Sequence, residues 1–376
     1  MIYLDWNATA PPHGQALQAW QRIQEQSWGN PSSIHAAGQA ARHYWDDARA
    51  RIARAMGAKP SQLVITGSGS EASNLAIHAS LQQQAPGLLV ASHIDHSSIL
   101  RPLAAQGAHR LHLLSVDQEG RIDADALRQV CNSDTRLVCL QWANNELGTL
   151  QDVPHLSAIV RECAPQAVIL CDACQGAGKM EIQCAAIDVD FIAISGHKFG
   201  APKGVGALLC RRPGPLAPLI HGGQQQQDRR SGTEDVAAAM AMAVALEHNL
   251  AQHLSEAPRQ AKLLSDAFAA IHRELPQARW LGRQAPRLNN TMNLACPGIE
   301  ADALMMRLDL EDIAVSRGSA CMASRREPSH VIRSLGLDPA IASAAIRISI
   351  GHSTTAQEME IFASTYVRIV RDMLGE

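Results

Sequence analysis

The sequence reads Ile192-Ala193-Ile194-Ser195-Gly196-His197-Lys198 and continues as Phe199-Gly200-Ala201-Pro202-Lys203-Gly204. The apolar, β-branched run predicts a buried strand, and the continuation, rich in Gly and Pro, predicts a turn. Most lysines bring their charge to the surface, but Lys198 has Ser195 and His197 beside it, compact polar residues that can hold an anion. A buried amine is costly unless it is paired or covalently occupied, so Lys198 is a candidate for chemistry.

A second apolar run, residues 167–171, ends in Asp172. An aspartate and a lysine at neighbouring strand ends fit the pyridinium partner and the Schiff-base lysine of a pyridoxal phosphate (PLP) site. Gln175, in the following turn, suits the pyridine end of the same cofactor. Cys171 and Cys174 form a C-x-x-C, but the first lies within the strand and no second pair exists, which disfavours a redox or zinc role.

The composition describes a globular chain of 376 residues, 46% hydrophobic and 18% charged, long enough for about two domains. The net charge of −3 argues against nucleic acid as a partner. Charges interrupt every apolar run before membrane-spanning length, and the N-terminus lacks the features of a signal peptide. The nine cysteines indicate reduced thiols, so we expect a cytoplasmic protein without a membrane partner.

Strand-like and helix-like runs alternate from Gln62 to Arg211, which predicts an α/β fold with a mostly parallel sheet flanked by helices. The expected strands are Leu63–Thr66, Leu88–Ser92, Leu111–Ser115, Leu137–Trp142, Val168–Asp172, Phe191–Ser195 and Gly206–Cys210. A long helical stretch ends near Glu274 and is expected to be broken or kinked at Pro258. We expect a large domain over residues 14–252 and a small α+β domain over 253–376, joined by the N-terminal arm, residues 1–13.

The polar clusters that follow the strands form the candidate site, because ligands bind at the carboxyl ends of parallel strands. Gly67–Ala72 can bind phosphate at a helix start, but it also matches the G-x-G-x-x-A of dinucleotide-binding folds. His96 can stack on a pyridine ring and move protons, or belong to a solvated loop or a partial metal site. No second ligand cluster stands out, so we expect no metal. Asn145 is either a turn residue or a partner of the cofactor's phenolic oxygen.

Two candidates lie late in the chain. Cys321 stands among small residues in Ser316–Ser324, which suggests an exposed loop, although most cysteines are buried and inert. Arg347 lies within a strand-like run, 345–349, and needs either a structural carboxylate or the carboxylate of a substrate as its partner.

Taken together, these segments resemble the cysteine desulfurases, class V members of the fold-type-I PLP enzymes. The resemblance covers nearly the whole chain, from Tyr3 to Arg347. The matching motifs are YLDWNATAP, GNPSSIH, ITGSGSEASNLAI, the His96 turn, WANNELGT, the Asp172–Gln175 turn, SGHKFGAPKGVG, RRSGTED and SRGSACMASRREPSHVIRSLG.

The resemblance implies a role for each matching residue. It implies that Lys198 holds PLP covalently, that Asp172 pairs with the ring nitrogen and that His96 stacks on the ring. It also implies that Gln175 and Asn145 contact the ring substituents. The phosphate is then held by Gly69, Ser70, Ser195 and His197. Thr233, from the other subunit of a homodimer, completes the phosphate site.

For the substrate, L-cysteine, the resemblance implies that Arg347 binds the carboxylate, with Asn145 nearby, and that Cys321 accepts the sulfur as a persulfide. The sulfur then passes to an acceptor protein, for iron–sulfur cluster assembly or another pathway; the sequence does not identify the acceptor. Cys174 and Arg317 depart from the residues usual in the family. A selenocysteine lyase or another class V PLP enzyme is the alternative within the family. Outside it, the alternatives are a dinucleotide-dependent oxidoreductase and a sulfur relay that binds no PLP.

Overall fold

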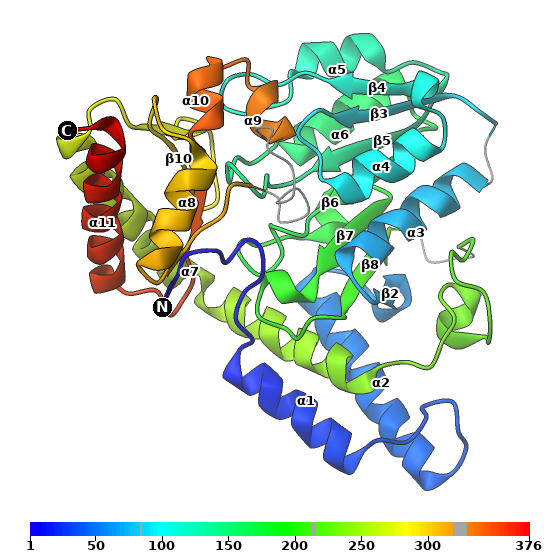
Figure 1. The fold of residues 1–376 in the computed structure, drawn as a ribbon. Helices are drawn as coiled ribbons and strands as arrows, with labels where there is room; N and C mark the ends of the chain where they lie inside the picture. The colour runs from blue at the N-terminus through cyan, green and yellow to red at the C-terminus, as the bar shows by residue number, and fades with distance from the viewer. Residues whose placement is uncertain (83–84, 212–215, 319–328) are drawn as a thin grey trace.

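A seven-stranded sheet forms the centre of the protein, in a computed structural model that describes residues 1–82, 85–211, 216–318 and 329–376 (Figure 1). The strand order is β2-β8-β7-β6-β5-β3-β4. Strands β7, β6, β5, β3 and β4 pair in parallel, whereas β8 is antiparallel to both β2 and β7. The predicted α/β fold with a mostly parallel sheet is confirmed.

The strands fall where the hydrophobic runs predict them, and only β4 and β5 differ from the expected ranges. Their bounds are β2 Leu63–Thr66, β3 Leu88–Ser92, β4 Leu111–Leu114, β5 Thr135–Gln141, β6 Val168–Asp172, β7 Phe191–Ser195 and β8 Gly206–Cys210.

Each face of this sheet has its own helical cover, because successive side chains along a strand point to opposite faces. On one face, α3 (Gly69–Gln82) and α4 (Ser97–Ala105) pack on residues such as Leu89 and Leu137. On the other face, Val90 and Val138 pack against α1 (Gly14–Gln26), α2 (Ala36–Ala55), α5 (Ala124–Val130), α6 (Val153–Cys163) and the first half of α7 (Val236–Glu274).

Helix α7 runs without interruption through Pro258, so of the two expectations for that position, a break or a kink, the break does not occur. Its two halves are held by different cores: Leu246 is buried against the large sheet, and Leu264 in a second core. Packing at both ends outweighs the hydrogen bond that proline removes.

The second core surrounds a small antiparallel sheet of order β12-β10-β9, with bounds β9 Arg279–Leu281, β10 Thr291–Ala295 and β12 Ala345–Ser349. Helices α8 (Ala301–Leu310) and α11 (Ala356–Leu374) pack on it, beside the second half of α7 (Figure 1). Two short helices, α9 (His330–Ser334) and α10 (Pro339–Ser343), precede β12. No helix in the described ranges is long and apolar enough to cross a membrane.

The N-terminal arm joins this second unit. Its strand β1 (Ile2–Tyr3) pairs in parallel with β11 (Ile313–Ala314), and Leu4 is fully buried in the second core. Asp5 then forms a bridge with Ser349, at the end of β12. The arm therefore runs from the small sheet toward the carboxyl ends of the large sheet before α1 begins.

Candidate active site

The predicted site residues converge on one pocket at the carboxyl edge of the parallel strands. Asp172 ends β6, Lys198 follows β7, His96 follows β3 and Asn145 follows β5. The pocket has a volume of about 960 Å³, open solvent included, and its wall also contains Gly69, Ser70, Gln175, Ser195, His197 and Arg347. Of the predicted set, Thr233 does not line it, and Cys321 lies outside the described residues.

Lys198 lies in a tight turn, Gly196–Lys198, directly after β7. Its Nζ donates hydrogen bonds to two backbone carbonyls of the arm, those of Asn7 (2.7 Å) and Ala8 (3.0 Å). Burial, and secondarily the positive charge of Arg347, lowers the pKa of Lys198 to about 8. The neutral amine that attacks a carbonyl group is therefore more accessible here than on a surface lysine.

Asp172 and His96 lie near this amine. The Oδ1 of Asp172 accepts the backbone N–H of Cys174 at 3.0 Å. The Nδ1 of His96 accepts the backbone N–H of Ser98 at 3.1 Å, so it carries a lone pair, and the neutral ring bears its proton on Nε2. Burial lowers the pKa of His96, although the negative charge of Asp172 opposes this, so the neutral ring is favoured.

Another part of the pocket wall offers the kinds of group that an anion needs. The backbone N–H of Gly69, at the start of α3, donates to Ser195 Oγ at 3.3 Å. A Cβ at position 69 would lie 2.5 Å from Cys174 Sγ and 2.9 Å from Ser195 Cβ, so only glycine fits. His197 Nδ1 lies 3.1 Å from Thr9 Oγ1, and burial lowers the pKa of His197 to about 4. Helix-start amides and hydroxyls bind phosphate.

The residues present fit PLP on these observations. A glycine-lined helix start and hydroxyl groups suit the phosphate, the Asp172 carboxylate suits the ring nitrogen, and Lys198 supplies an amine of lowered pKa. The pocket volume lies within the range of small-molecule sites.

Arg347 on β12 brings a cation to the same pocket from the small sheet. It is 1% exposed, and its guanidinium donates to the Asn145 carbonyl (3.0 Å) and to Asp5 Oδ1 (2.5 Å). The sequence allowed two partners for Arg347, a structural carboxylate or the carboxylate of a substrate. The structure shows a structural one, Asp5 of the arm. Because Arg347 also lines the pocket, it can reach a second carboxylate there.

Asn7 is a residue of this site that the sequence argument missed. Its backbone carbonyl accepts from Lys198 and from Gln175 Nε2 (3.0 Å), and its amide donates to Thr291 Oγ1 (2.8 Å). Its hydrogen-bond partners lie 138 to 342 residues away, so no local pattern could reveal them. The arm motif YLDWNATAP was the one signal that contained it.

Both described flanks of residues 319–328 lie beside the pocket. Ser316 exchanges two backbone hydrogen bonds with Arg347 (3.1 and 2.5 Å), and a Cβ on Gly318 would lie 2.8 Å from the Glu146 carboxylate. On the other side, His330 Nε2 lies 3.0 Å from the Asp95 carbonyl. The residues on either side of 319–328 are therefore anchored next to the pocket.

None of the described cysteines whose pKa is shifted is activated as a nucleophile. Burial raises the thiol pKa of Cys131, Cys139, Cys171, Cys174, Cys184, Cys210 and Cys296. A raised pKa disfavours the reactive thiolate, which agrees with the sequence argument against a redox C-x-x-C. Within the described ranges no cluster of three metal-ligating side chains occurs.

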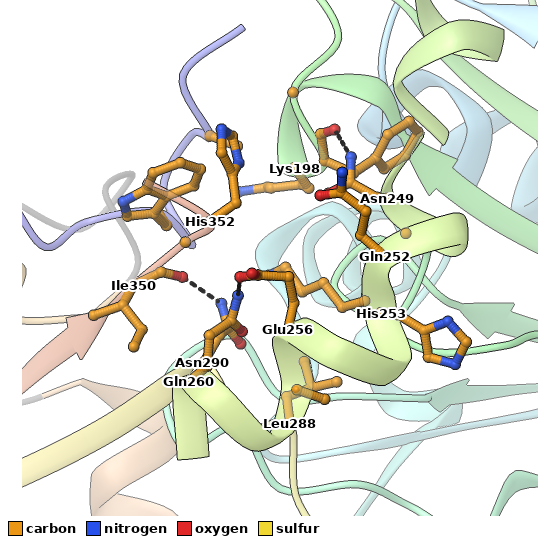
Figure 2. A pocket seen from close by; sticks show the side chains of 18 of the residues that line it. Lys198, Asn249, Gln252, His253, Glu256, Gln260, Leu288, Asn290, Ile350 and His352 are labelled. Carbon is orange, nitrogen blue, oxygen red and sulfur yellow. Dashed lines mark hydrogen bonds between the residues drawn. The ribbon is translucent and has the colours of Figure 1, made fainter. Parts of the chain in front are cut away.

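Thr233 lies in a separate crevice, beside Ser27 and Trp28 at the end of α1. A second pocket borders Lys198 from the side of α7 and is shown in Figure 2. There Asn249 donates to the Phe199 carbonyl at 2.7 Å. Of the predicted site residues only Lys198 reaches this second pocket, so the candidate site is the pocket at the strand ends.

Comparison with known proteins agrees with this geometry. The profile of the aminotransferase class-V family matches residues 2–362. The cysteine desulfurase IscS of Dictyoglomus turgidum is 33% identical over 99% of this chain and 95% of its own. An IscS-like cysteine desulfurase of Mycobacterium tuberculosis is 36% identical, over 96% and 94%. A solved NifS-like protein superposes with a TM-score of 0.91 at 28% identity, covering 98% of this chain and 99% of its own.

The chain belongs to the class V aminotransferase family of PLP-dependent enzymes. Within that family it is a cysteine desulfurase, as the resemblance of its motifs predicted.

Proposed function

We propose that this enzyme takes the sulfur of L-cysteine onto the Cys321 thiol. The Cβ–S bond of the substrate breaks and an S–S bond forms, so that L-cysteine and one protein thiol become alanine and one protein persulfide. The observation that supports this most directly is the position of Lys198, Asp172 and Arg347 around one pocket, with both flanks of residues 319–328 beside it.

The strand-end residues bind PLP in this proposal. Gly69, Ser70, Ser195 and His197 hold the phosphate, and Asn145 and Gln175 contact the ring substituents. When bound, PLP supplies an electron sink for the Cα carbanion of the substrate. Asp172 keeps the ring nitrogen protonated, since a carboxylate next to it stabilises the cation.

Lys198 is the covalent anchor, and its amine takes the proton from the substrate Cα. The amine suits both tasks because its pKa is lowered to about 8. His96 stacks on the ring and assists proton transfer, with Nε2–H as the donor that its Nδ1 contact leaves available.

Arg347 binds the substrate carboxylate. It approaches from the small sheet, and its guanidinium is already oriented by Asn145 and Asp5. The chain segment that carries Cys321 begins two residues beyond Arg317, which is anchored by an ion pair with Asp302 on α8. This ion pair fixes the described residues that precede the segment.

The site is completed across a homodimer in this proposal. Thr233 does not line the pocket of its own subunit, which agrees with a role in the phosphate site of the partner subunit. We also propose the division into residues 14–252 and 253–376 with the arm 1–13, a cytoplasmic location and an acceptor protein for the sulfur. The separate cores that hold the two halves of α7 and the burial of Leu4 in the second core support the division.

The test is direct. Purified protein supplied with PLP should show a visible absorption band and convert L-cysteine to alanine and sulfide in equal amounts when a reducing thiol is present. A protein that acquires no band, or that releases pyruvate instead of alanine, would refute the proposal.

A further inference from the structure

Lys179 is a lysine of this region to which the proposed function gives no role. It lies four residues after Gln175 in the loop that follows β6, and it is partly buried. Its Nζ donates to Gln175 Oε1 at 2.6 Å and to Asn7 Oδ1 at 2.9 Å. Among the described residues it forms no ion pair with a carboxylate, so its contacts are two amide oxygens.

Asn7 is locked by its other contacts. Its Oδ1 also accepts from Asn290 Nδ2 (3.0 Å), and its Nδ2 donates to Thr291 Oγ1 (2.8 Å) and to the Asn145 carbonyl (3.1 Å). Together with the bond from Lys179, these are four contacts, and they allow the Asn7 amide only one orientation. Lys179 has only N–H groups to offer, so the Asn7 oxygen, not the nitrogen, must face it. The backbone carbonyl of Asn7 is then positioned to accept from Gln175 Nε2 at 3.0 Å.

The same logic fixes the amide of Gln175. Its oxygen must face the donor, Lys179, so its nitrogen faces the Asn7 carbonyl and the pocket that Gln175 lines. One N–H is used by Asn7, and the second has no acceptor among the described residues. Burial lowers the pKa of Lys179 well below its usual value, but even a neutral amine has the two N–H groups that these contacts need.

We propose that Lys179 is a positioning residue: it turns the Gln175 amide so that this side chain presents a hydrogen-bond donor, not an acceptor, to the bound cofactor. A donor at that place stabilises a negatively charged ring oxygen and lowers the pH at which the visible spectrum of the bound cofactor changes. The inference rests on the proposed function, since it places Gln175 beside the PLP ring.

The test is a pH titration of the visible absorption of the holoenzyme, without substrate. Lys179→Met keeps the length of the side chain but has no donor, so the Gln175 amide loses the partner of its oxygen and is held only by the bond of its nitrogen to the Asn7 carbonyl. The donor to the pocket is then less firmly oriented, and the midpoint should rise, by up to about one pH unit. Lys203→Met is the matched control, because Lys203 is an exposed lysine that touches neither amide, and its midpoint should stay at the wild-type value. An unshifted midpoint in Lys179→Met would overturn the proposal.

A second variant keeps Lys179 in place. In Gln175→Glu the carboxylate still accepts from Lys179 but offers no donor to the pocket, so the midpoint should also rise. This variant tests the donor even if Lys179→Met fails to fold. A midpoint that stays at the wild-type value in Gln175→Glu would overturn the proposal.

A double-mutant cycle separates orientation from bare charge. In a Gln175→Ala background no amide remains to be turned, so Lys179→Met should shift the midpoint much less than it does in the wild type. Equal shifts in both backgrounds would overturn the positioning role while leaving the desulfurase proposal intact. A wild-type protein that shows no visible band would instead refute the proposed function, and this inference with it.

Discussion

The pocket has two walls that are built in different ways. The strand-end wall, consisting of Gly69, Ser70, His96, Asp172, Ser195, His197 and Lys198, is placed by the backbone of the sheet, because each of these residues ends or follows a strand. Asp172 is also held locally, by its bond to the Cys174 N–H. The arm wall, consisting of Asn7 and of Arg347 with its partner Asp5, which does not itself line the pocket, is held by side-chain bonds between distant segments, such as that of Asn7 to Thr291.

This difference indicates a division of labour. The strand-end wall carries the groups of the reaction, and the folded sheet places their backbone, although the Lys198 amine also bonds to the arm. The arm wall exists only when the arm is docked on the small sheet, so it sets orientation and substrate binding. Substitutions in the first wall should therefore remove chemistry, and those in the second should mainly change affinity.

The largest effect is expected for Lys198→Ala. It removes both the covalent anchor and the base, so alanine release should fall by about a thousandfold or more. Lys203→Ala, a change of an exposed lysine in the following turn, should retain wild-type turnover. Borohydride reduction and peptide mapping provide the check: cofactor found on Lys203, or on no lysine, would contradict the assignment.

Asp172→Asn should reduce kcat by about a hundredfold while the protein retains some PLP, because a neutral amide cannot hold the ring nitrogen protonated. Cofactor content, measured by absorption after release in alkali, separates lost binding from lost chemistry. Turnover near the wild-type rate would show that the strand-end wall does not supply the electron sink.

A substitution in the arm wall should have a different kinetic signature. Arg347→Lys keeps a positive charge but loses the planar fork that holds Asn145 and Asp5 while binding a carboxylate. We expect KM for L-cysteine to rise by about tenfold, with a smaller change in kcat. A fall in kcat at unchanged KM would place Arg347 with the reacting groups and break the comparison.

The smallest expected effect is on stability, and it comes from Asp95, a buried carboxyl group next to the strand-end wall. Asp95 is buried beside His96, and burial, reinforced by Asp172, raises the pKa of its carboxyl from 3.8 to about 8. The folded chain therefore holds this proton more tightly than the unfolded chain, and the free energy of unfolding falls as pH rises between these values. In Asp95→Asn this dependence is lost, so the variant should gain stability over the wild type as pH rises.

Urea unfolding of both proteins at about pH 5 and about pH 8.5 measures this effect. The advantage of Asp95→Asn should be larger at the higher pH. The same difference in unfolding free energy at both pH values would mean that the folded-state pKa of Asp95 is not raised.

The two walls also differ in how far the sequence predicts them. Asp172 and Lys198 each end an apolar run, and parallel pairing of β6 with β7 brings such ends together, so their meeting could be foreseen. The pairing of Asp5 with Arg347 depends on the arm lying along β12, and nothing in either segment indicates it. Whether α7 breaks or continues at Pro258 was left open for a similar reason, since the packing that holds the helix is tertiary.

The most direct test of the account is a mass measurement on wild type and Cys321→Ser after one equivalent of L-cysteine, without reductant. An alcohol is a poor nucleophile toward sulfur at neutral pH, so Cys321→Ser should keep its PLP, bind L-cysteine and gain no sulfur. The wild type should gain one sulfur atom that maps to the Cys321 peptide, with one alanine released. If Cys321→Ser converts L-cysteine to alanine and sulfide at close to the wild-type rate, Cys321 is not the sulfur acceptor and the account is contradicted.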